Sequence, residues 1–321
     1  MTARLPATLI GGYLGAGKTT LVNALLRGAG GRRLAVLVND FGELPVDADL
    51  IEAREGNLLN ISGGCICCSF GSDLLAAIME LRASKRPIDH LLIETSGVAL
   101  PQSIAQSLRL MPDIDLNGIV ALADAETVRQ RAADRYMGDT VLAQLASSDI
   151  VVLNKIDLVS PEQVAAVRAW LSEVAPRAGV VPARRAAVPP DLILMQHGEP
   201  NTGRFLASSH DPATQLASIS MEIAGDGDPE ALAAALANAS LHLLRAKGIV
   251  ADRRGALAAI HVMGQRCSVE PAPSAVQGPG RLVCIGLASE LDAGAITAAI
   301  AACPPFAAKL IHKGESLPAN S

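Results

Sequence analysis

Basic charge and aromatic side chains are both scarce in this sequence of 321 residues. Lys and Arg number 27 against 32 Asp and Glu, which gives a formal net charge of −5, and aromatic residues make up only 2%. Proteins that bind nucleic acid usually carry a basic surface, and single-strand binders also need aromatic rings on which bases stack. The composition therefore predicts that nucleic acid is not a partner.

Long hydrophobic runs are also missing, so no segment is expected to span a membrane. An apolar stretch does follow Arg4, as in a signal peptide, but it ends in Lys18-Thr19-Thr20 and is better explained by a phosphate-binding loop. Three of the six cysteines fall within residues 65–68, which is not the spacing of a disulfide framework. We therefore expect a cytoplasmic protein with reduced thiols.

Half of the residues are hydrophobic, so the chain can bury a large core, and its length suggests two domains. Alternating strand and helix patterns in the first part predict an α/β fold with a doubly wound, mostly parallel sheet. The strand patterns lie at 7–10, 34–40, 89–93, 118–124 and 149–153, and the helical patterns lie at 101–110, 126–146 and 161–174.

The second part of the sequence predicts a smaller α+β domain with an antiparallel sheet. Its strand patterns lie at 217–223, 256–270 and 281–287, and its helical patterns at 229–245 and 291–302. The residues Arg245-Ala246-Lys247-Gly248 resemble the basic last turn and glycine cap of the first of these helices. The expected divisions are a first domain over 1–185, a linker over 186–216, a second domain over 217–312 and a frayed tail over 313–321.

A glycine-rich loop lies between the first strand and a helical pattern. Residues 12–20 read Gly-Tyr-Leu-Gly-Ala-Gly-Lys-Thr-Thr and fit the pattern Gly, four residues, Gly-Lys-Thr. Backbone N–H groups of such a loop and the following helix N-terminus attract phosphate, the lysine reaches the β- and γ-phosphates, and the threonine hydroxyl completes a Mg²⁺ shell. The predicted phosphate-binding residues are Gly12, Gly15, Ala16, Gly17, Lys18, Thr19 and Thr20.

A second motif, Asn154-Lys155-Ile156-Asp157, follows a buried strand and predicts a preference for GTP. Asp157 can accept hydrogen bonds from the N1–H and 2-amino groups of guanine, which adenine lacks, and the Lys155 stem can pack on the ring. Asn154 is expected to hold the loop in place and to reach the base. A site built on these hydrogen bonds rejects adenine, because adenine leaves the carboxylate without partners.

Glu94-Thr95-Ser96-Gly97 follows another strand. Glu94 is expected to hold a water of the Mg²⁺ shell, and the Gly97 amide to sense the γ-phosphate. The carboxylates Asp40, Glu43 and Asp47 lie in a long loop that γ-phosphate and Mg²⁺ could order, with Asp47 as a candidate Mg²⁺ ligand and plain solvation as the alternative for each.

The same loop leads into a cluster of thiols. Cys65, Cys67 and Cys68 suit a soft or borderline ion such as Zn²⁺, Co²⁺ or Cu⁺, but no second cysteine pair completes a closed structural zinc site. Three thiols with an open position, or with Asp40 or Glu43 as a fourth ligand, form a site that can release its metal. A redox-active cluster and buried core cysteines are the alternatives. Cys267, Cys284 and Cys303 are scattered, and we expect them to be small core residues.

In sequence order, these motifs resemble those of CobW-type GTPases, which are related to the HypB and UreG metallochaperones. The resemblance rests on residues 11–20, Asn39-Asp-Phe-Gly-Glu43, Gly63-Gly-Cys-Ile-Cys-Cys68, 94–97 and 154–157, and it extends more weakly over 217–303. It implies a slow GTPase that binds a transition metal at the cysteines, delivers it to a client metalloprotein or metal-inserting enzyme, and forms homo-oligomers that depend on nucleotide and metal. Two features differ from the family: it usually has Glu at the position of Asp40, and many members carry a histidine-rich run that is absent here.

The sequence thus predicts a GTP-dependent metallochaperone that uses GTP, Mg²⁺ and Zn²⁺ or Co²⁺, with Lys18, Glu94 and Gly97 acting in hydrolysis. One alternative is a regulatory GTPase whose cysteines sense metal or redox state. Another is a phosphate-loop kinase, which the guanine-type motif at 154–157 disfavours.

Overall fold

The computed structural model describes residues 4–38, 58–60, 78–79, 81, 88–194, 216–272 and 279–315. The chain divides into two compact units, Met1–Leu194 and Met195–Ser321. Within the described ranges, no helix has the length and apolar character needed to cross a membrane.

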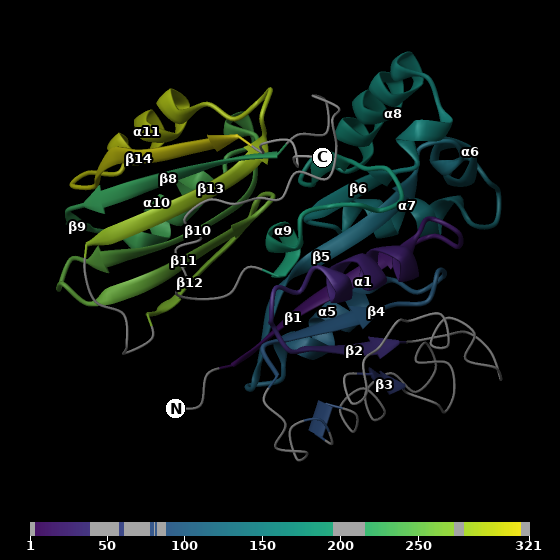
Figure 1. Cartoon of the computed structure of the whole chain (residues 1–321), viewed down its shortest axis with the longest axis horizontal. Helices are drawn as coiled ribbons and strands as arrows, with labels where there is room; N and C mark the ends of the chain where they lie inside the picture. Colours follow the sequence, from purple (N-terminus) through teal and green to yellow (C-terminus); the bar gives the residue numbers. More distant parts are fainter. Residues whose placement is uncertain are drawn as a thin grey trace. The chain divides into compact units, whose positions relative to one another are not determined.

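The first unit is built on a sheet of seven strands in the order β3-β2-β4-β1-β5-β6-β7 (Figure 1). Every neighbouring pair is parallel, which confirms the predicted doubly wound α/β fold. The strands are β1 (Leu5–Gly12), β2 (Leu34–Val38), β3 (Leu58–Asn60), β4 (His90–Glu94), β5 (Ile114–Asp124), β6 (Ile150–Asn154) and β7 (Gly179–Pro182). The helices are α1 (Lys18–Arg27), α5 (Pro101–Arg109), α6 (Val128–Ala132), α7 (Gly138–Ala146), α8 (Pro161–Val174) and α9 (Pro190–Leu194), with a 3₁₀ turn at Ile156–Leu158.

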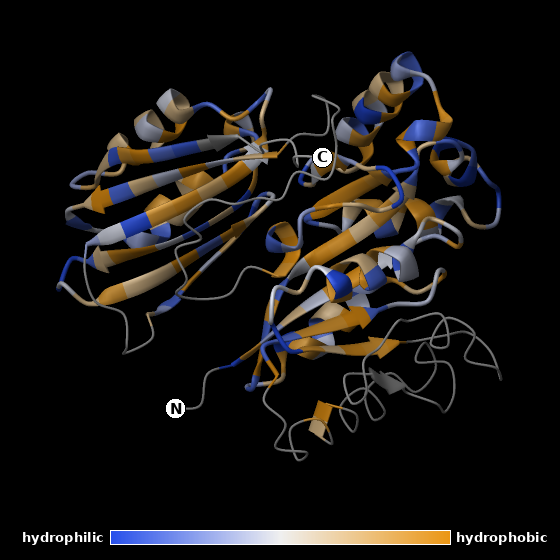
Figure 2. Cartoon of the chain, viewed as in Figure 1, coloured by the Kyte–Doolittle hydropathy of each residue, from blue (hydrophilic) through white to orange (hydrophobic). Residues whose placement is uncertain are grey.

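Burial on both faces explains why the strands of this sheet are continuously apolar. All residues of β2, β4 and β6 are buried, and Figure 2 shows these strands as largely hydrophobic. One core cluster joins β1 and β4 to Ile104 and Leu108 of α5, and another joins β6 to Leu145 of α7 and Leu171 of α8. The order of strands places the carboxyl end of β1 between those of β4 and β5, so the loops that follow all three strands meet at one edge.

Helix α8 coincides with the predicted helix over 161–174 because its start is encoded locally. The Ser160 side chain accepts a hydrogen bond from the Gln163 amide (3.3 Å), and the Gln163 side chain accepts one from the Ser160 amide (2.9 Å). This reciprocal capping box, followed by Pro161 at the first helical position, fixes the helix start.

The single helix predicted over 126–146 is wrong, because a turn divides it into α6 and α7. The Asp134 side chain accepts hydrogen bonds from the amides of Tyr136 (2.8 Å) and Met137 (3.0 Å), which hold the chain in the turn and lower the pKa of this carboxyl. A Cβ on Gly138 would lie 2.5 Å from the Ala132 carbonyl oxygen, so the second helix can start there only with glycine.

The first unit extends to Leu194, beyond the domain end at 185 estimated from the sequence. Leu192, Ile193 and Leu194 of α9 are buried. Asp191 at the start of this helix accepts a hydrogen bond from Arg32 at 2.5 Å, which attaches the segment to the loop after α1.

The second unit contains a sheet in the order β12-β11-β10-β13-β8-β14, with β9 paired to β10. All pairs are antiparallel except β9 with β10, as the predicted α+β class requires. Its strands are β8 (Leu216–Ala224), β9 (Asp226–Gly227), β10 (Leu243–Asp252), β11 (Leu257–Met263), β12 (Arg266–Pro271), β13 (Gly280–Leu287) and β14 (Ala307–Glu315). Its helices are α10 (Pro229–Leu236) and α11 (Ala293–Ala301), with a 3₁₀ turn at Ala239–Leu241. Leu232, Leu236, Ile296 and Ile300 of these helices belong to its core.

The helix predicted over 229–245 ends at Leu236, and residues 243–252 form strand β10 instead. His242, with φ of 51°, turns the chain, and the following residues pair with β11 on one side and β13 on the other. This pairing outweighs the local helix preference of the Leu and Ala residues. The capping interpretation of 245–248 is therefore wrong: a Cβ on Gly248 would lie 2.7 Å from the Arg281 carbonyl oxygen, so this glycine permits close strand approach.

Two smaller differences concern other strands of this unit. The single strand predicted over 256–270 is a hairpin of β11 and β12, with a turn at Gly264, whose φ is 56°. The frayed tail predicted from 313 includes paired residues, because Gly314 and Glu315 of β14 lie opposite Ser218 and Ala217 of β8.

Candidate nucleotide-binding site

The loop between β1 and α1 has the backbone geometry of a phosphate cradle. Gly12, Gly15 and Gly17 have φ angles of 129°, 77° and 107°, which side chains other than glycine rarely adopt. A Cβ on Gly12 would lie 2.4 Å from the Leu122 carbonyl oxygen, and one on Gly17 would lie 2.5 Å from Asn154 Nδ2. The glycines let the loop curl tightly at the N-terminus of α1, where backbone amides and the helix dipole favour an anion.

Lys18 and Thr19 begin α1, and Thr19 contacts the end of β4. Lys18 is largely buried. The Thr19 hydroxyl donates a hydrogen bond to Oε1 of Glu94 at 2.9 Å, and Glu94 is 1% exposed. A hydroxyl and a buried carboxylate joined in this way beside a phosphate loop fit the oxygen ligands that Mg²⁺ prefers. Strands β1 and β4 set this geometry, because Ile10 is in register with Glu94.

Asn154, at the end of β6, connects the phosphate loop to the loop after β7. Its Nδ2 donates to the Ala16 carbonyl oxygen at 2.9 Å, and its Oδ1 accepts from the Ala186 amide at 2.7 Å. Asn154 is 2% exposed, so both hydrogen bonds are shielded from water. One side chain therefore fixes two backbone segments that lie far apart in the sequence.

Lys155 and Asp157 follow on the same loop but are oriented differently. Lys155 has a positive φ of 61°, and its Nζ forms an ion pair with Asp124 Oδ2 at 2.6 Å. Asp124 ends β5 and is in register with Asn154. The ion pair holds the lysine stem in one orientation, while Asp157 in the 3₁₀ turn is exposed and available to a ligand.

The loop after β4 packs directly on the phosphate loop. A Cβ on Gly97 would lie 2.5 Å from a side-chain carbon of Leu14 and 2.9 Å from its amide nitrogen, so only glycine permits this approach. The Ala99 amide closes a turn by donating to the Ser96 carbonyl at 3.1 Å. Gln144 of α7 donates from Nε2 to the carbonyls of Gly97 (3.0 Å) and Ala99 (2.8 Å).

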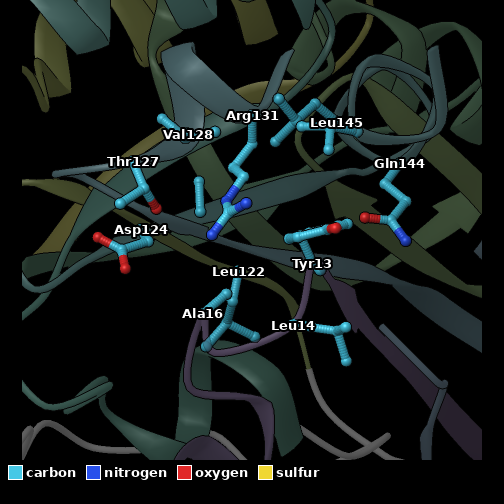
Figure 3. Close-up of a pocket in the computed structure, with 13 residues that line it drawn as sticks. Tyr13, Leu14, Ala16, Leu122, Asp124, Thr127, Val128, Arg131, Gln144 and Leu145 are labelled. Carbon is cyan, nitrogen blue, oxygen red and sulfur yellow. The ribbon is translucent and has the colours of Figure 1, made fainter. Parts of the chain in front are cut away.

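A small pocket opens beside the phosphate loop, on the side of α6 and α7 (Figure 3). It holds about 340 Å³ of empty space, part of it open to solvent. The Arg131 guanidinium points into it and lies 5.5 Å from the centre of the Tyr13 ring, a cation–π contact. Gln144 and Asp124 are also among the lining residues; Gln144 is hydrogen-bonded to the loop after β4, and Asp124 is ion-paired with Lys155 after β6.

Around the phosphate loop, the structure gathers Lys18 and Thr19 at the start of α1, Glu94 at the end of β4 and Asn154 at the end of β6. Sequence reasoning missed Asp124, Gln144 and Ala186. Asp124 could have been noticed as a carboxylate at the end of a predicted strand. Gln144 lies inside a helical pattern and Ala186 in a region interpreted as a linker, so neither carried a local signal.

The predicted transition-metal residues Cys65, Cys67, Cys68 and Asp40 lie outside the described residues, as do Glu43 and Asp47. The residues that are described contain no group of three or more His, Cys, Asp or Glu side chains placed to hold a metal.

The three cysteines of the second unit differ in environment, so a common role as core residues is wrong. Cys284 is fully buried, and burial raises its pKa to about 12. Cys303 is half-buried, and its pKa is raised by burial and by the negative charge of Asp228. Cys267 is exposed.

Comparison with protein families gives two matches, one in each unit. The model described as "CobW/HypB/UreG, nucleotide-binding domain" matches residues 6–182, and "Cobalamin synthesis protein cobW C-terminal domain" matches residues 216–304. These stretches coincide closely with those on which the sequence resemblance rests.

Curated relatives carry consistent names. The chain is 34% identical over 230 residues to "Zinc chaperone CobW" of Pseudomonas aeruginosa, which covers 61% of this chain and 61% of that protein. It is 28% identical to the protein of the same name from Sinorhizobium sp, over 93% of this chain and 97% of the relative. It is 31% identical to "Zinc-regulated GTPase metalloprotein activator 1" of Dictyostelium discoideum, over 63% of this chain and 49% of the relative.

Among solved structures, Zn(II)-bound YjiA GTPase from E. coli is 22% identical and covers 94% of this chain and 99% of its own, with a TM-score of 0.47.

Proposed function

The chain belongs to the CobW/HypB/UreG family, as the family matches show and the sequence motifs predicted, and from that premise we propose that it is a GTP-dependent metallochaperone. The chain is a phosphate-loop GTPase by family and fold. The proposal is that GTP binding and hydrolysis control a transition-metal site at Cys65, Cys67 and Cys68, from which Zn²⁺ or Co²⁺ passes to a client metalloprotein or metal-inserting enzyme.

The observation that carries the nucleotide part of the proposal is the double hydrogen bond of Asn154. It attaches the loop that contains Asp157 to the phosphate loop. The residue that would bind guanine, Asp157, and the residues that would bind the phosphates, 12–18, therefore belong to one rigid site. Because the side chain is buried and both of its polar ends are used, the distance between the base and phosphate subsites is set before a ligand arrives.

In the proposed reaction, backbone amides of the phosphate loop and Lys18 bind the β- and γ-phosphates, and Thr19 and Glu94 hold Mg²⁺ directly or through water, with Asp47 as the further candidate. When bound, Mg²⁺ neutralises charge on the phosphate oxygens. The Gly97 amide is proposed to donate to the γ-phosphate, and its contact with Leu14 supports this role because it places the glycine backbone against the cradle. Loss of the γ-phosphate on hydrolysis removes that hydrogen bond.

The metal part of the proposal rests on sequence adjacency and on the names of the relatives. The segment 39–47 begins directly after β2, which lies beside β4, the strand that ends in Glu94. It continues toward the three cysteines, so a loop that responds to γ-phosphate can alter the metal ligands. Relatives named zinc chaperones and metalloprotein activators support Zn²⁺ as the cargo and a metalloprotein as the client. Co²⁺, and homo-oligomers that depend on nucleotide and metal, are further parts of the proposal.

The base-reading role of Asp157 has a direct test. In Asp157→Asn, the amide can donate to the 2-oxo group of xanthine but can no longer accept from both guanine donors, so we expect the preference to change from GDP to XDP. Calorimetric titration with GDP, XDP and ADP measures this, and Asp139→Asn, an exposed acidic residue of α7, is the matched control. A wild-type protein that binds ADP as well as GDP would contradict the proposal.

Lys18→Ala tests the catalytic part. We expect it to remove GTP turnover without unfolding the protein, because Lys18 contributes its charge to the phosphates. Phosphate release measures turnover, and a folded variant with wild-type turnover would overturn the role.

A further inference from the structure

Gln144 is a buried polar residue that the predicted GTPase motifs leave unexplained. It lies in the last turn of α7 and is 1% exposed, where an apolar residue is expected on the inner face of a helix. Burying an amide is costly unless its hydrogen-bonding groups find partners. Gln144 meets this requirement by donating to the carbonyls of Gly97 and Ala99, at 3.0 and 2.8 Å.

Both acceptors lie in the loop after β4, in the turn that the Ala99 amide closes on Ser96. The two hydrogen bonds fix the peptide planes that follow Gly97 and Ala99. The orientation of the Gly97 amide depends on this turn, because its N–H shares a peptide plane with the Ser96 carbonyl, which accepts the hydrogen bond from the Ala99 amide.

We infer that Gln144 is a positioning residue, which holds the Gly97 amide against the phosphate loop so that it can donate to the γ-phosphate. The inference rests on the proposed function and deepens it, because it names the residue that makes the site distinguish GTP from GDP. Gln144 acts through the backbone of the loop and touches neither nucleotide nor Mg²⁺. GDP lacks the γ-phosphate, so its binding does not depend on this amide.

The location of Gln144 also links the γ-phosphate sensor to α7. The residue borders the pocket that contains Arg131 and Tyr13 (Figure 3). Two hydrogen bonds join the turn at 96–99 to α7, so a displacement of either one alters the interactions of the other. Such reciprocity follows from any interaction that two sites share.

Gln144→Met is the test, because methionine has a similar length and fills the buried volume without any N–H donor. The assays are titrations of the full chain with GDP and with a non-hydrolysable GTP analogue, together with GTP turnover. We expect GDP affinity to stay within about twofold of wild type, while analogue affinity and kcat each fall about tenfold, which corresponds to about 1.4 kcal/mol. The loss of two buried hydrogen bonds is sufficient for a change of this size. Ser148→Ala is the matched control, since its buried hydroxyl donates to the Leu145 carbonyl (2.7 Å) at the end of the same helix without reaching the turn.

The outcomes separate cleanly. Unchanged analogue affinity and kcat in Gln144→Met overturn the inference, and so does an equal loss of GDP and analogue affinity, which would make Gln144 a general structural residue. The same selective loss of analogue affinity in Ser148→Ala would attribute the effect to the end of helix α7 as a whole and would also overturn it. Retained GDP binding shows that the variant is folded. Failure of the wild-type protein to bind guanine nucleotides would instead refute the proposed function.

Discussion

Replacing Asn154 by alanine tests whether this side chain unites the base and phosphate subsites. The substitution removes the donor to the Ala16 carbonyl and the acceptor for the Ala186 amide, and both groups are shielded by the surrounding fold. Each buried group left without its partner costs about 1–3 kcal/mol. We therefore expect the free energy of unfolding of the first unit to fall by about 2–6 kcal/mol.

The single tryptophan of the chain, Trp170, makes this measurable in the intact protein. It lies in α8 and packs against the core of the first unit, so its fluorescence reports the unfolding of that unit in urea. Gln106→Ala, which removes an exposed amide from α5, is the matched control and should change stability by less than about 0.5 kcal/mol.

GDP affinity should also fall at least about tenfold in Asn154→Ala, since one decade corresponds to about 1.4 kcal/mol and the phosphate loop loses its attachment. A loss of stability no larger than that of the Gln106 control, or an unchanged GDP affinity, would refute the reasoning.

Two further predictions concern backbone strain and thiol chemistry. Gly12→Ala should destabilise the first unit by about 2–4 kcal/mol and abolish GDP binding. The reason is that residue 12 has a φ of 129° and that a Cβ there would lie 2.4 Å from the Leu122 carbonyl oxygen. Urea unfolding and calorimetry measure the two effects, and a variant that binds GDP normally would contradict the prediction. Cys284 should resist alkylation at pH 9 in the folded protein while the exposed Cys267 reacts, because burial raises the pKa of Cys284 to about 12. Peptide mass spectrometry measures the modification of each cysteine. Modification of the two cysteines at equal rates would contradict the prediction. The raised pKa also makes the stability of the second unit depend on pH. Between the ordinary pKa of a thiol and about 12, Cys284 ionises in the unfolded chain but not in the folded protein, so the second unit loses stability as the pH rises through this range.

The parts of the fold that sequence predicted well are those encoded by neighbouring residues. Ser160, Pro161 and Gln163 specify the start of α8 by themselves, and the turns of the phosphate loop require its glycines. The continuous apolar runs of the parallel strands were recognisable because strands buried on both faces need no alternation.

The parts that sequence missed depend on distant partners. Strand β10 has residues compatible with a helix, and only pairing with β11 and β13 selects the strand. The same is true of the site: the motifs identified Thr19, Glu94 and Asn154, but the role of Gln144 arises from carbonyls that lie 45 and 47 positions away in the chain. A polar residue inside a helical pattern gives no indication of such partners.

The central claim is that GTP controls the affinity of the cysteine site for metal. The most direct measurement is a competition titration of Zn²⁺ against a chromophoric chelator, with the protein saturated first by a non-hydrolysable GTP analogue and then by GDP. A Cys65→Ser, Cys67→Ser, Cys68→Ser variant serves as the control for metal bound elsewhere. We predict tighter Zn²⁺ binding in the analogue-bound state, by about tenfold or more, because typical coupling free energies of 1–3 kcal/mol correspond to this range. Equal Zn²⁺ affinities in the two nucleotide states would contradict the account, since a nucleotide that does not distinguish the two states of the metal site cannot drive metal release.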